Sequence, residues 1–303
     1  MKNQRQAYLY GLAAVLLWST MASAFKLSLR YLTPAELLLH AALTSSIVLF
    51  LLLVIQGKLF LLKQLSWADL KPSLSLGLLN PVLYYLVLLK AYDLLPAQQA
   101  QPLNYTWAIT LSLLSIPLLG QKISRRELVA VVISYLGVVV ISTRGNPFAL
   151  NFESPLGVAL ALISTIFWAL YWIFNTRDQR DPVFGLLLNF LCGMPMVLVY
   201  ILITEGLRVP PIQGLMGATY VGLFEMGLTF VLWLKAMKLS INSARIANLI
   251  FISPFLSLVF IHFLVGEEIL PSTLVGLVLI ICGLVVQQWR RKRRVRVAQK
   301  GEK

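Results

Sequence analysis

Ten long apolar stretches constrain this chain more than any other feature of its sequence. Nine contain no Asp, Glu, Lys or Arg, and the stretch 209–234 contains one glutamate; they are 6–25, 37–57, 72–89, 94–121, 128–143, 154–176, 182–204, 209–234, 246–266 and 269–289. A helix needs about 20 apolar residues to cross a bilayer, with a range of roughly 17–25. Only the stretch 128–143 falls slightly short of this range. The sequence therefore predicts ten transmembrane helices.

The composition agrees with a membrane protein. Of the 303 residues, 58% are hydrophobic and 13% are charged, whereas soluble domains carry about 25% charged residues. A closed β-barrel is the other structure that spans a bilayer, and its strands appear as segments of roughly ten residues with alternating hydrophobicity. The apolar stretches of this chain are longer and do not alternate. We therefore predict an all-α integral membrane protein.

The basic residues gather on one side of the predicted membrane. The net charge is +14, and the tail 290–303, RRKRRVRVAQKGEK, supplies half of it with eight Lys or Arg against one Glu. Lys and Arg are enriched in cytoplasmic loops, so both termini are predicted to be cytoplasmic. The tail directly follows an apolar stretch, and its expected partners are therefore anionic lipid headgroups rather than nucleic acid. The basic residues expected on the opposite side are Lys26, Arg30, Lys90, Arg144 and Arg208.

The two halves of the chain are related in sequence. Residues 120–140, GQKISRRELVAVVISYLGVVV, align without gaps on residues 266–286, GEEILPSTLVGLVLIICGLVV. The identities include glycines at both ends of the alignment, Gly120 with Gly266 and Gly137 with Gly283. We predict two five-helix repeats, residues 8–143 and 154–289, followed by the basic cytoplasmic tail 290–303.

An odd number of helices in each repeat has a topological consequence. The second repeat begins on the opposite side of the membrane from the first, so the repeats are inverted about a pseudo-two-fold axis in the membrane plane. This arrangement is typical of secondary transporters, whose substrate site lies near the midplane between the repeats. The first helix ends in Ala22-Ser23-Ala24, which matches the cleavage pattern of a signal peptide. Because the second half contains a counterpart of this helix, the repeat favours a first helix that is retained rather than cleaved.

The repeated segments resemble the drug/metabolite transporter superfamily, specifically its EamA-type ten-helix exporters. The resemblance is carried by Gly266-Glu267, the short polar linker after it, the glycine-spaced final helix, and Trp18-Ser19 in the first helix. It implies an inner-membrane carrier that exports small metabolites such as amino acids, commonly linked to protons. Many members carry an arginine near the position of His40 in the second helix, so a role for that arginine does not transfer to this chain.

Glu225 is the most informative polar residue. It lies midway along the stretch 209–234, where a charge costs about 2.5–3.5 kcal/mol to insert. The carboxyl group must therefore face a cavity or a partner, or be protonated; a structural, hydrogen-bonded glutamate is the alternative. Gly77-Leu78-Leu79-Asn80 aligns on Gly222-Leu223-Phe224-Glu225, so Asn80 occupies the equivalent position of the first repeat. We predict that Asn80 and Glu225 line one central cavity and that Glu225 couples transport to protons.

Further polar and aromatic residues at membrane depth are weaker candidates. His40 is a second candidate for proton coupling, because it lies one helical turn from Glu36; a neutral interfacial histidine is the alternative. Core packing and interfacial belts are the alternatives for the aromatic residues. The predicted cavity lining is Trp18, Ser19, Tyr84, Asn104, Trp107, Trp168, Tyr171 and Asn248.

Two other classes of function compete with a secondary carrier. A passive channel or lipid scramblase is compatible with inverted repeats, although Glu225 favours a coupled carrier. A membrane-embedded transferase would need several carboxylates to hold Mg²⁺, and the sequence offers only the weak motif 175–181, NTRDQRD. The chain also lacks an HExxH, a Walker A or a Gly-x-Ser-x-Gly motif. We therefore predict a transporter of a small molecule with no cofactor, no metal and no catalytic residues.

Overall fold

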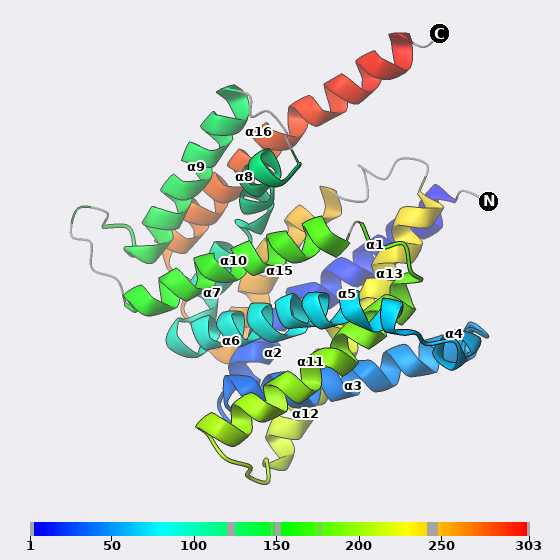
Figure 1. The fold of residues 1–303 in the computed structure, drawn as a ribbon. Helices are drawn as coiled ribbons and strands as arrows, with labels where there is room; N and C mark the ends of the chain where they lie inside the picture. The colour runs from blue at the N-terminus through cyan, green and yellow to red at the C-terminus, as the bar shows by residue number, and fades with distance from the viewer. Residues whose placement is uncertain are drawn as a thin grey trace.

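The computed structural model describes residues 3–119, 125–146, 148, 153–175, 177–240 and 248–301. Within these ranges the chain is helical and contains no β-strand, which agrees with the predicted all-α class. Figure 1 shows long helices packed side by side, with the last helix extending beyond the rest of the molecule.

The first half of the chain forms α1 to α9. Two of the predicted helices are interrupted. The stretch 6–25 is divided at Thr20 between α1 and α2, and the stretch 94–121 is divided at Tyr105 and Thr106 between α7 and α8. The elements are α1 (Gln4–Ser19), α2 (Met21–Ser28), α3 (Pro34–Ile55), α4 (Phe60–Lys63), α5 (Trp67–Gly77), the π-helix η1 (Leu78–Leu83), α6 (Tyr84–Leu94), α7 (Ala97–Asn104), α8 (Trp107–Leu119) and α9 (Arg125–Ser142).

The second half runs from α10 to α16. Its elements are α10 (Pro155–Asn175), α11 (Pro182–Thr204), α12 (Ile212–Phe224), α13 (Leu228–Leu239), the 3₁₀-helix η2 (Asn248–Ile252), α15 (Ser253–Phe260), the π-helix η3 (Ile261–Val265) and α16 (Pro271–Gly301). The apolar stretch 246–266 is therefore not one regular helix. The helix predicted over 269–289 continues through the basic tail to Gly301.

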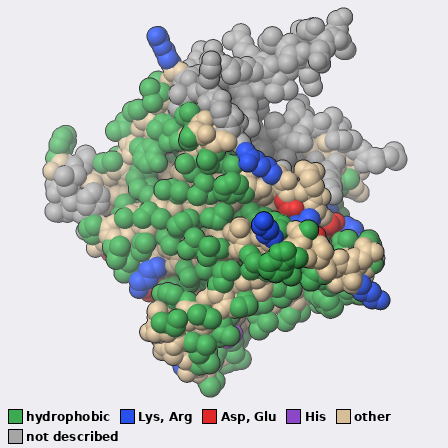
Figure 2. Space-filling model, viewed as in Figure 1, with side chains coloured by type: hydrophobic (Ala, Val, Ile, Leu, Met, Phe, Trp, Pro, Cys, Tyr) green, Lys and Arg blue, Asp and Glu red, His purple; other side chains and the backbone are tan. Residues whose placement is uncertain are grey.

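Six helical segments of the described chain are long and apolar enough to cross a bilayer: Gln4–Ser28, Pro34–Ile55, Trp67–Leu94, Pro155–Asn175, Pro182–Thr204 and Ile212–Trp233. Shorter apolar helices cover Leu128–Ser142, Leu249–Val265 and Pro271–Val286. The face seen in Figure 2 is dominated by hydrophobic side chains, with Lys and Arg in a few separate spots. Such a surface is expected where lipid rather than water surrounds the protein.

Local sequence explains where the helices begin. Thr33 accepts a hydrogen bond from the Glu36 backbone N–H, the Glu36 side chain accepts one from the Thr33 N–H, and Pro34 opens α3. This reciprocal pair is a capping box, which satisfies otherwise unpaired N–H groups. Asp181 caps α11 in a related way, by accepting from the N–H groups of Val183 and Phe184.

Glycines allow the closest helix contacts. An added Cβ at Gly77 of α5 would come within 2.5 Å of the Asn189 carbonyl oxygen on α11. At Gly137 of α9 it would come within 2.5 Å of the Gly276 carbonyl oxygen on α16. Small residues let backbones approach each other in membrane proteins, and these contacts hold α5 against α11 and α9 against α16.

Candidate functional site

Two helix interruptions place the central polar residues. α5 ends at Gly77, and Asn80 has non-helical angles (φ −148°, ψ 114°) just before Pro81. Proline lacks an N–H and cannot continue the helical hydrogen-bond ladder. In the second half, α12 ends at Phe224, Glu225 follows it, and Gly227 precedes α13 with φ −111° and ψ −95°. Asn80 and Glu225, which the alignment made equivalent, therefore both lie where a membrane helix is interrupted.

Glu225 has a tyrosine partner that the sequence did not indicate. The Tyr85 hydroxyl donates to Glu225 Oε1 at 3.1 Å. Tyr85 is almost fully buried, whereas Glu225 keeps part of its surface accessible. From the sequence we named only Tyr84 of the Tyr84-Tyr85 pair. Both tyrosines follow Asn80 by about one helical turn, and this spacing was the signal in the sequence that could have indicated Tyr85.

Five predicted residues form one cluster across α6, α7, α8 and α10. The Tyr84 ring stacks on Trp168, with centroids 4.5 Å apart, and Trp168 stacks on Tyr171 at 5.8 Å. Trp107 meets Trp168 edge-on at 6.4 Å. The Tyr84 hydroxyl donates to Asn104 Oδ1 at 3.4 Å, and Asn104 Nδ2 donates to the Ser164 hydroxyl at 3.0 Å. We call these five residues (Tyr84, Asn104, Trp107, Trp168 and Tyr171) the Trp168 cluster.

The Trp168 cluster reaches Glu225 through neighbouring tyrosines. The rings of Tyr84 and Tyr85 lie 4.7 Å apart, centroid to centroid, and Tyr85 holds Glu225. The fold thus brings a carboxyl group from the second half beside aromatic and amide groups that come mostly from the first half. An arrangement of flat apolar faces with a few polar groups is characteristic of a small-molecule site.

Trp18 and Ser19 lie in a separate group. Trp18 packs against Phe230, at 6.1 Å, and Trp233, at 5.4 Å, both on α13. Ser19 donates to the Val15 carbonyl at 2.6 Å and to the Ser253 hydroxyl of α15 at 3.1 Å. Within the described part of the chain, no ring contact joins Trp18 to the Trp168 cluster. These two residues fix α1 against α13 and α15.

His40 and Asn248 complete the predicted set. His40 Nδ1 lies 2.8 Å from the Glu36 carbonyl oxygen of its own helix, and because a carbonyl only accepts, Nδ1 is the donor. Among the described residues, no hydrogen bond joins His40 to Glu225. The side chain of Asn248 lies outside the described residues, although its backbone begins η2.

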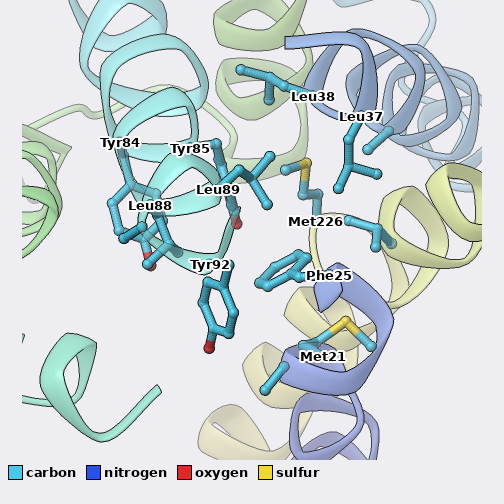
Figure 3. Close-up of a cluster of buried hydrophobic side chains, with 14 of the residues drawn as sticks. Met21, Phe25, Leu37, Leu38, Tyr84, Tyr85, Leu88, Leu89, Tyr92 and Met226 are labelled. Atoms are coloured by element: carbon cyan, nitrogen blue, oxygen red, sulfur yellow. The ribbon is translucent and has the colours of Figure 1, made fainter. Parts of the chain in front are cut away.

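A packed apolar layer borders the carboxyl group. The rings of Phe25 and Tyr92 meet at 5.3 Å and 68°, and Met226, the residue after Glu225, is buried in the same core. Figure 3 shows Phe25 of α2 beside Tyr92 of α6, with Met21 and Met226 nearby. This layer separates Glu225 from the connection that follows α6.

Polar contacts close the molecule beyond that layer. Lys26 Nζ donates to the carbonyls of Tyr92 and Leu95, both at 2.7 Å, at the end of α6. Glu267 accepts from the N–H groups of Ala97 and Gln98, at 2.7 and 3.0 Å, at the start of α7. A cation at a helix C-terminus and an anion at an N-terminus both complement the helix dipole. We call this end of the molecule the Glu267 end.

Ion pairs lie near both ends of the molecule. Arg208 forms a bidentate pair with Glu36, which raises the pKa of the Arg208 guanidinium through the hydrogen bond to that carboxylate. Near the other end, Lys58 donates to Asp181 at 2.6 Å. Burial raises the pKa of Asp181, but the hydrogen bonds from Lys58 and the α11 backbone outweigh it, and the net pKa lies below the usual value.

The described residues contain no group of three or more His, Cys, Asp or Glu that could hold a metal ion. The arrangement around Glu225 offers one carboxyl, hydroxyl and amide groups, and aromatic faces. These groups can bind a small polar solute and exchange a proton with it.

Comparison with known proteins gives a consistent assignment. The EamA-like transporter family matches residues 5–143 and 155–287. An uncharacterized transporter of Archaeoglobus fulgidus is 24% identical over 281 residues, covering 90% of this chain and 95% of that protein. The uncharacterized transporter YoaV of Bacillus subtilis is 22% identical over 289 residues, covering 93% and 97%.

Two further similarities extend this result. Protein PecM of Dickeya dadantii is 25% identical over 221 residues, covering 70% of this chain and 72% of PecM. One crystal structure has the same fold, with a TM-score of 0.67, 21% identity, and coverage of 97% of this chain and 99% of that chain. Family and relatives indicate a transporter rather than an enzyme. The chain belongs to the EamA-like transporter family and is a multi-pass membrane transporter.

Proposed function

We propose that this transporter is a secondary active exporter of small metabolites such as amino acids, and that it exchanges them for protons at Glu225. The observation that carries the proposal is the position of Glu225 at a helix interruption, partly accessible and hydrogen-bonded to Tyr85. A carboxylate at membrane depth is costly. A proton or the ammonium group of a substrate removes that cost, so the two compete for one group, which is the requirement for exchange.

The aromatic surroundings suit the same class of solute. Tyr84, Trp168 and Tyr171 present stacked rings beside the polar groups of Asn104 and Glu225. Aromatic faces attract ammonium groups and pack against apolar side chains. The proposed substrate therefore carries a cationic amine that Glu225 binds and an apolar part that packs on the Trp168 cluster.

We also propose that the protein has ten membrane helices in two inverted repeats, 8–143 and 154–289. Helix bounds support this at a nearly constant offset. α5 and α12 begin at Trp67 and Ile212, and α6 and α13 end at Leu94 and Leu239, in each case 145 positions apart. α3 and α11 begin at Pro34 and Pro182, which are 148 apart. The two segments matched by the family have nearly the same bounds as the proposed repeats.

Equivalent glycine contacts are stronger support for the repeat. Gly77 abuts Asn189, and the equivalent Gly222 abuts Ala41, at offsets of 145 and 148. Likewise Gly137 abuts Gly276, and Gly283 abuts Ala130, both related by 146. A chance similarity between apolar sequences would not place the same backbone contacts at equivalent positions of the two halves.

Polar contacts between loops support alternation of the helices across the membrane. Thr33 donates to Glu205, Arg30 to the Val265 carbonyl, and Gln99 to Glu153. All six residues lie in or beside connections that ten alternating helices place on one side. Residues near 58, 69 and 181 meet one another on the other side.

This topology places both termini in the cytoplasm of a cell whose inner membrane holds the protein. Both lie at the upper right of Figure 1. Anionic lipid headgroups are the proposed contact of the basic tail 290–303. The Lys26 and Glu267 hydrogen bonds join α2, α6 and α7 at the Glu267 end, which this topology places outside. Alternating access then requires these contacts to open.

Transport in proteoliposomes tests the exchange. An imposed pH gradient is expected to drive accumulation of a radiolabelled amino acid or amine from a screened set. Glu225→Gln should purify and melt like the parent protein yet lose the gradient-driven component. Glu205→Gln is the matched control, because Glu205 is exposed and near the membrane surface. Unchanged pH-dependent transport by Glu225→Gln contradicts the proposal, and lipid movement without a gradient indicates a scramblase instead.

A further inference from the structure

A second buried polar group shares Tyr171 with the Trp168 cluster: the ring of Tyr171 stacks on Trp168, and its hydroxyl belongs to this group. It consists of Asn80, Asn189 and Tyr171, which are 2%, 0% and 3% exposed. Asn80 Oδ1 and both polar atoms of the Asn189 amide have no hydrogen-bond partner among the described residues. Burying an amide without a partner is costly, because the amide loses its hydrogen bonds to water. Two such amides together leave buried polar atoms that a bound ion or water can satisfy.

Three elements converge on this group and hold it rigidly. Asn80 lies in the non-helical interruption of η1, Asn189 on α11 and Tyr171 on α10. The Tyr171 hydroxyl lies beside the side-chain amides of both asparagines. Gly77 abuts the Asn189 backbone, and a Cβ added at Gly193, one turn further along α11, would lie 3.0 Å from the Pro81 ring. These contacts fix the spacing of α5, η1 and α11 around the two amides.

The chemistry of the group identifies its class of ligand. Asn80 Oδ1, Asn189 Oδ1 and the Tyr171 hydroxyl oxygen are neutral oxygen donors. Divalent ions in proteins are usually held with the help of carboxylates, whereas neutral oxygens next to an interrupted helix are the usual ligands of Na⁺ in transporters. A water on the ion can accept from Asn189 Nδ2, which satisfies the remaining polar atom.

Charges around the group do not oppose a monovalent cation. The ionic groups nearest Tyr171 are Asp178 and Arg180, which form a bidentate pair with each other at 2.6 to 3.1 Å. Their charges largely cancel. The carboxyl of Glu225 is hydrogen-bonded to Tyr85. A bound monovalent cation therefore meets one neutralised pair and one carboxyl group.

The group related to this one by the repeat has a different chemistry. At the offsets of the repeat, Glu225 replaces Asn80, Ala41 replaces Asn189, and Met21 replaces Tyr171. Ala41 and Met21 offer no side-chain oxygen. The two related groups thus differ in kind, with a titratable carboxyl in one and a neutral oxygen set in the other.

We propose that Asn80, Asn189 and Tyr171 form a binding site for one monovalent metal cation, with Na⁺ as the expected ion. The site shares the Tyr171 side chain with the Trp168 cluster but does not include Glu225, and its occupancy can be measured without transport.

Thermal melting of the purified full-length protein in detergent tests the site. Melting is compared in NaCl, LiCl, KCl and choline chloride at one ionic strength. The parent protein is expected to gain roughly 3 °C or more in NaCl over choline chloride, with saturation. Asn189→Leu replaces the amide with an apolar group of similar size, so it should fold and melt normally in choline chloride but lose the Na⁺ response. Tyr171→Phe should weaken the response.

Controls separate this site from others. Ser45→Ala also removes a buried hydroxyl without a described partner, at the position of the first repeat that corresponds to Gly193, and should keep the Na⁺ response. Glu225→Gln should keep it as well. Identical melting of the parent protein in all four salts would show that water fills the group and overturn the proposal, as would a full Na⁺ response in Asn189→Leu.

Discussion

Gly77→Ala is the sharpest test of the packing between α5 and α11. The added Cβ would come within 2.5 Å of the Asn189 carbonyl oxygen and 3.3 Å of the Gly193 nitrogen. Both are backbone atoms, so no side-chain rotation relieves the overlap. The helices must separate by roughly 1 Å to restore a normal contact.

The expected loss follows from two opposing effects. Overpacking of this kind costs about 1–3 kcal/mol, and replacing glycine by alanine in a helix returns about 0.5–1 kcal/mol. The net destabilisation is about 1–2 kcal/mol. A lowering of the melting temperature by roughly 2–8 °C is expected in a fluorescence melting assay in detergent.

A matched control and an equivalent variant make this test decisive. At Gly185, also in a helix, the nearest atom to an added Cβ is the flexible Asp178 carboxylate oxygen at 3.3 Å, so Gly185→Ala should melt at or above the parent temperature. Gly222→Ala should lose stability as Gly77→Ala does, since it overlaps the Ala41 carbonyl. If Gly77→Ala melts like Gly185→Ala, the spacing of α5 and α11 argued above is wrong.

Two further predictions concern the ion pairs. Arg208→Gln should lower the free energy of unfolding by about 1–2 kcal/mol, because it leaves the buried carboxylate of Glu36 without its half-exposed partner. Once Arg208 is replaced, adding Glu36→Gln should cost little more. Melting shifts that simply add in the double variant would refute the pairing. Asp181→Asn keeps an α11 cap but loses the ion pair with Lys58, so it should cost less than about 1 kcal/mol at pH 7. Because the folded-state pKa of Asp181 is lowered, its contribution exists above the unfolded value of about 3.9 and is lost as pH falls through the folded value. The difference in melting temperature between the two proteins should therefore shrink as the pH falls below about 3.9, and a difference that stays constant on acidification would contradict the assignment.

Much of the fold was predictable from the sequence, because lipid imposes a simple rule. Backbone polar groups in a bilayer must pair within each helix, so apolar length alone located the helical segments. The bounds of α10 and α11, for instance, lie within two residues of the predicted stretches. The interruption at Asn80 was also anticipated in part by Pro81. Glu225 was singled out for the same reason, since a lone carboxyl in an apolar stretch is conspicuous.

The candidate site was predictable only in part. Tyr84, Asn104, Trp107, Trp168 and Tyr171 do come together, yet Trp18 and Ser19 pack elsewhere and His40 bonds within its own helix. Residue type identified these positions, but the packing face of each helix depends on its partners. In an all-round apolar helix, hydrophobic periodicity does not distinguish those faces.

The sequence by itself determined the helical class and the apolar segments and aligned Asn80 with Glu225, because each depends on local composition or on comparison of one half with the other. Only the tertiary structure decided that Tyr85 holds Glu225 and that Asn189 joins Asn80 and Tyr171. Those partners lie far apart in the chain and meet because glycine-lined helices approach closely. Such contacts depend on how three-dimensional surfaces fit, which no single apolar stretch encodes.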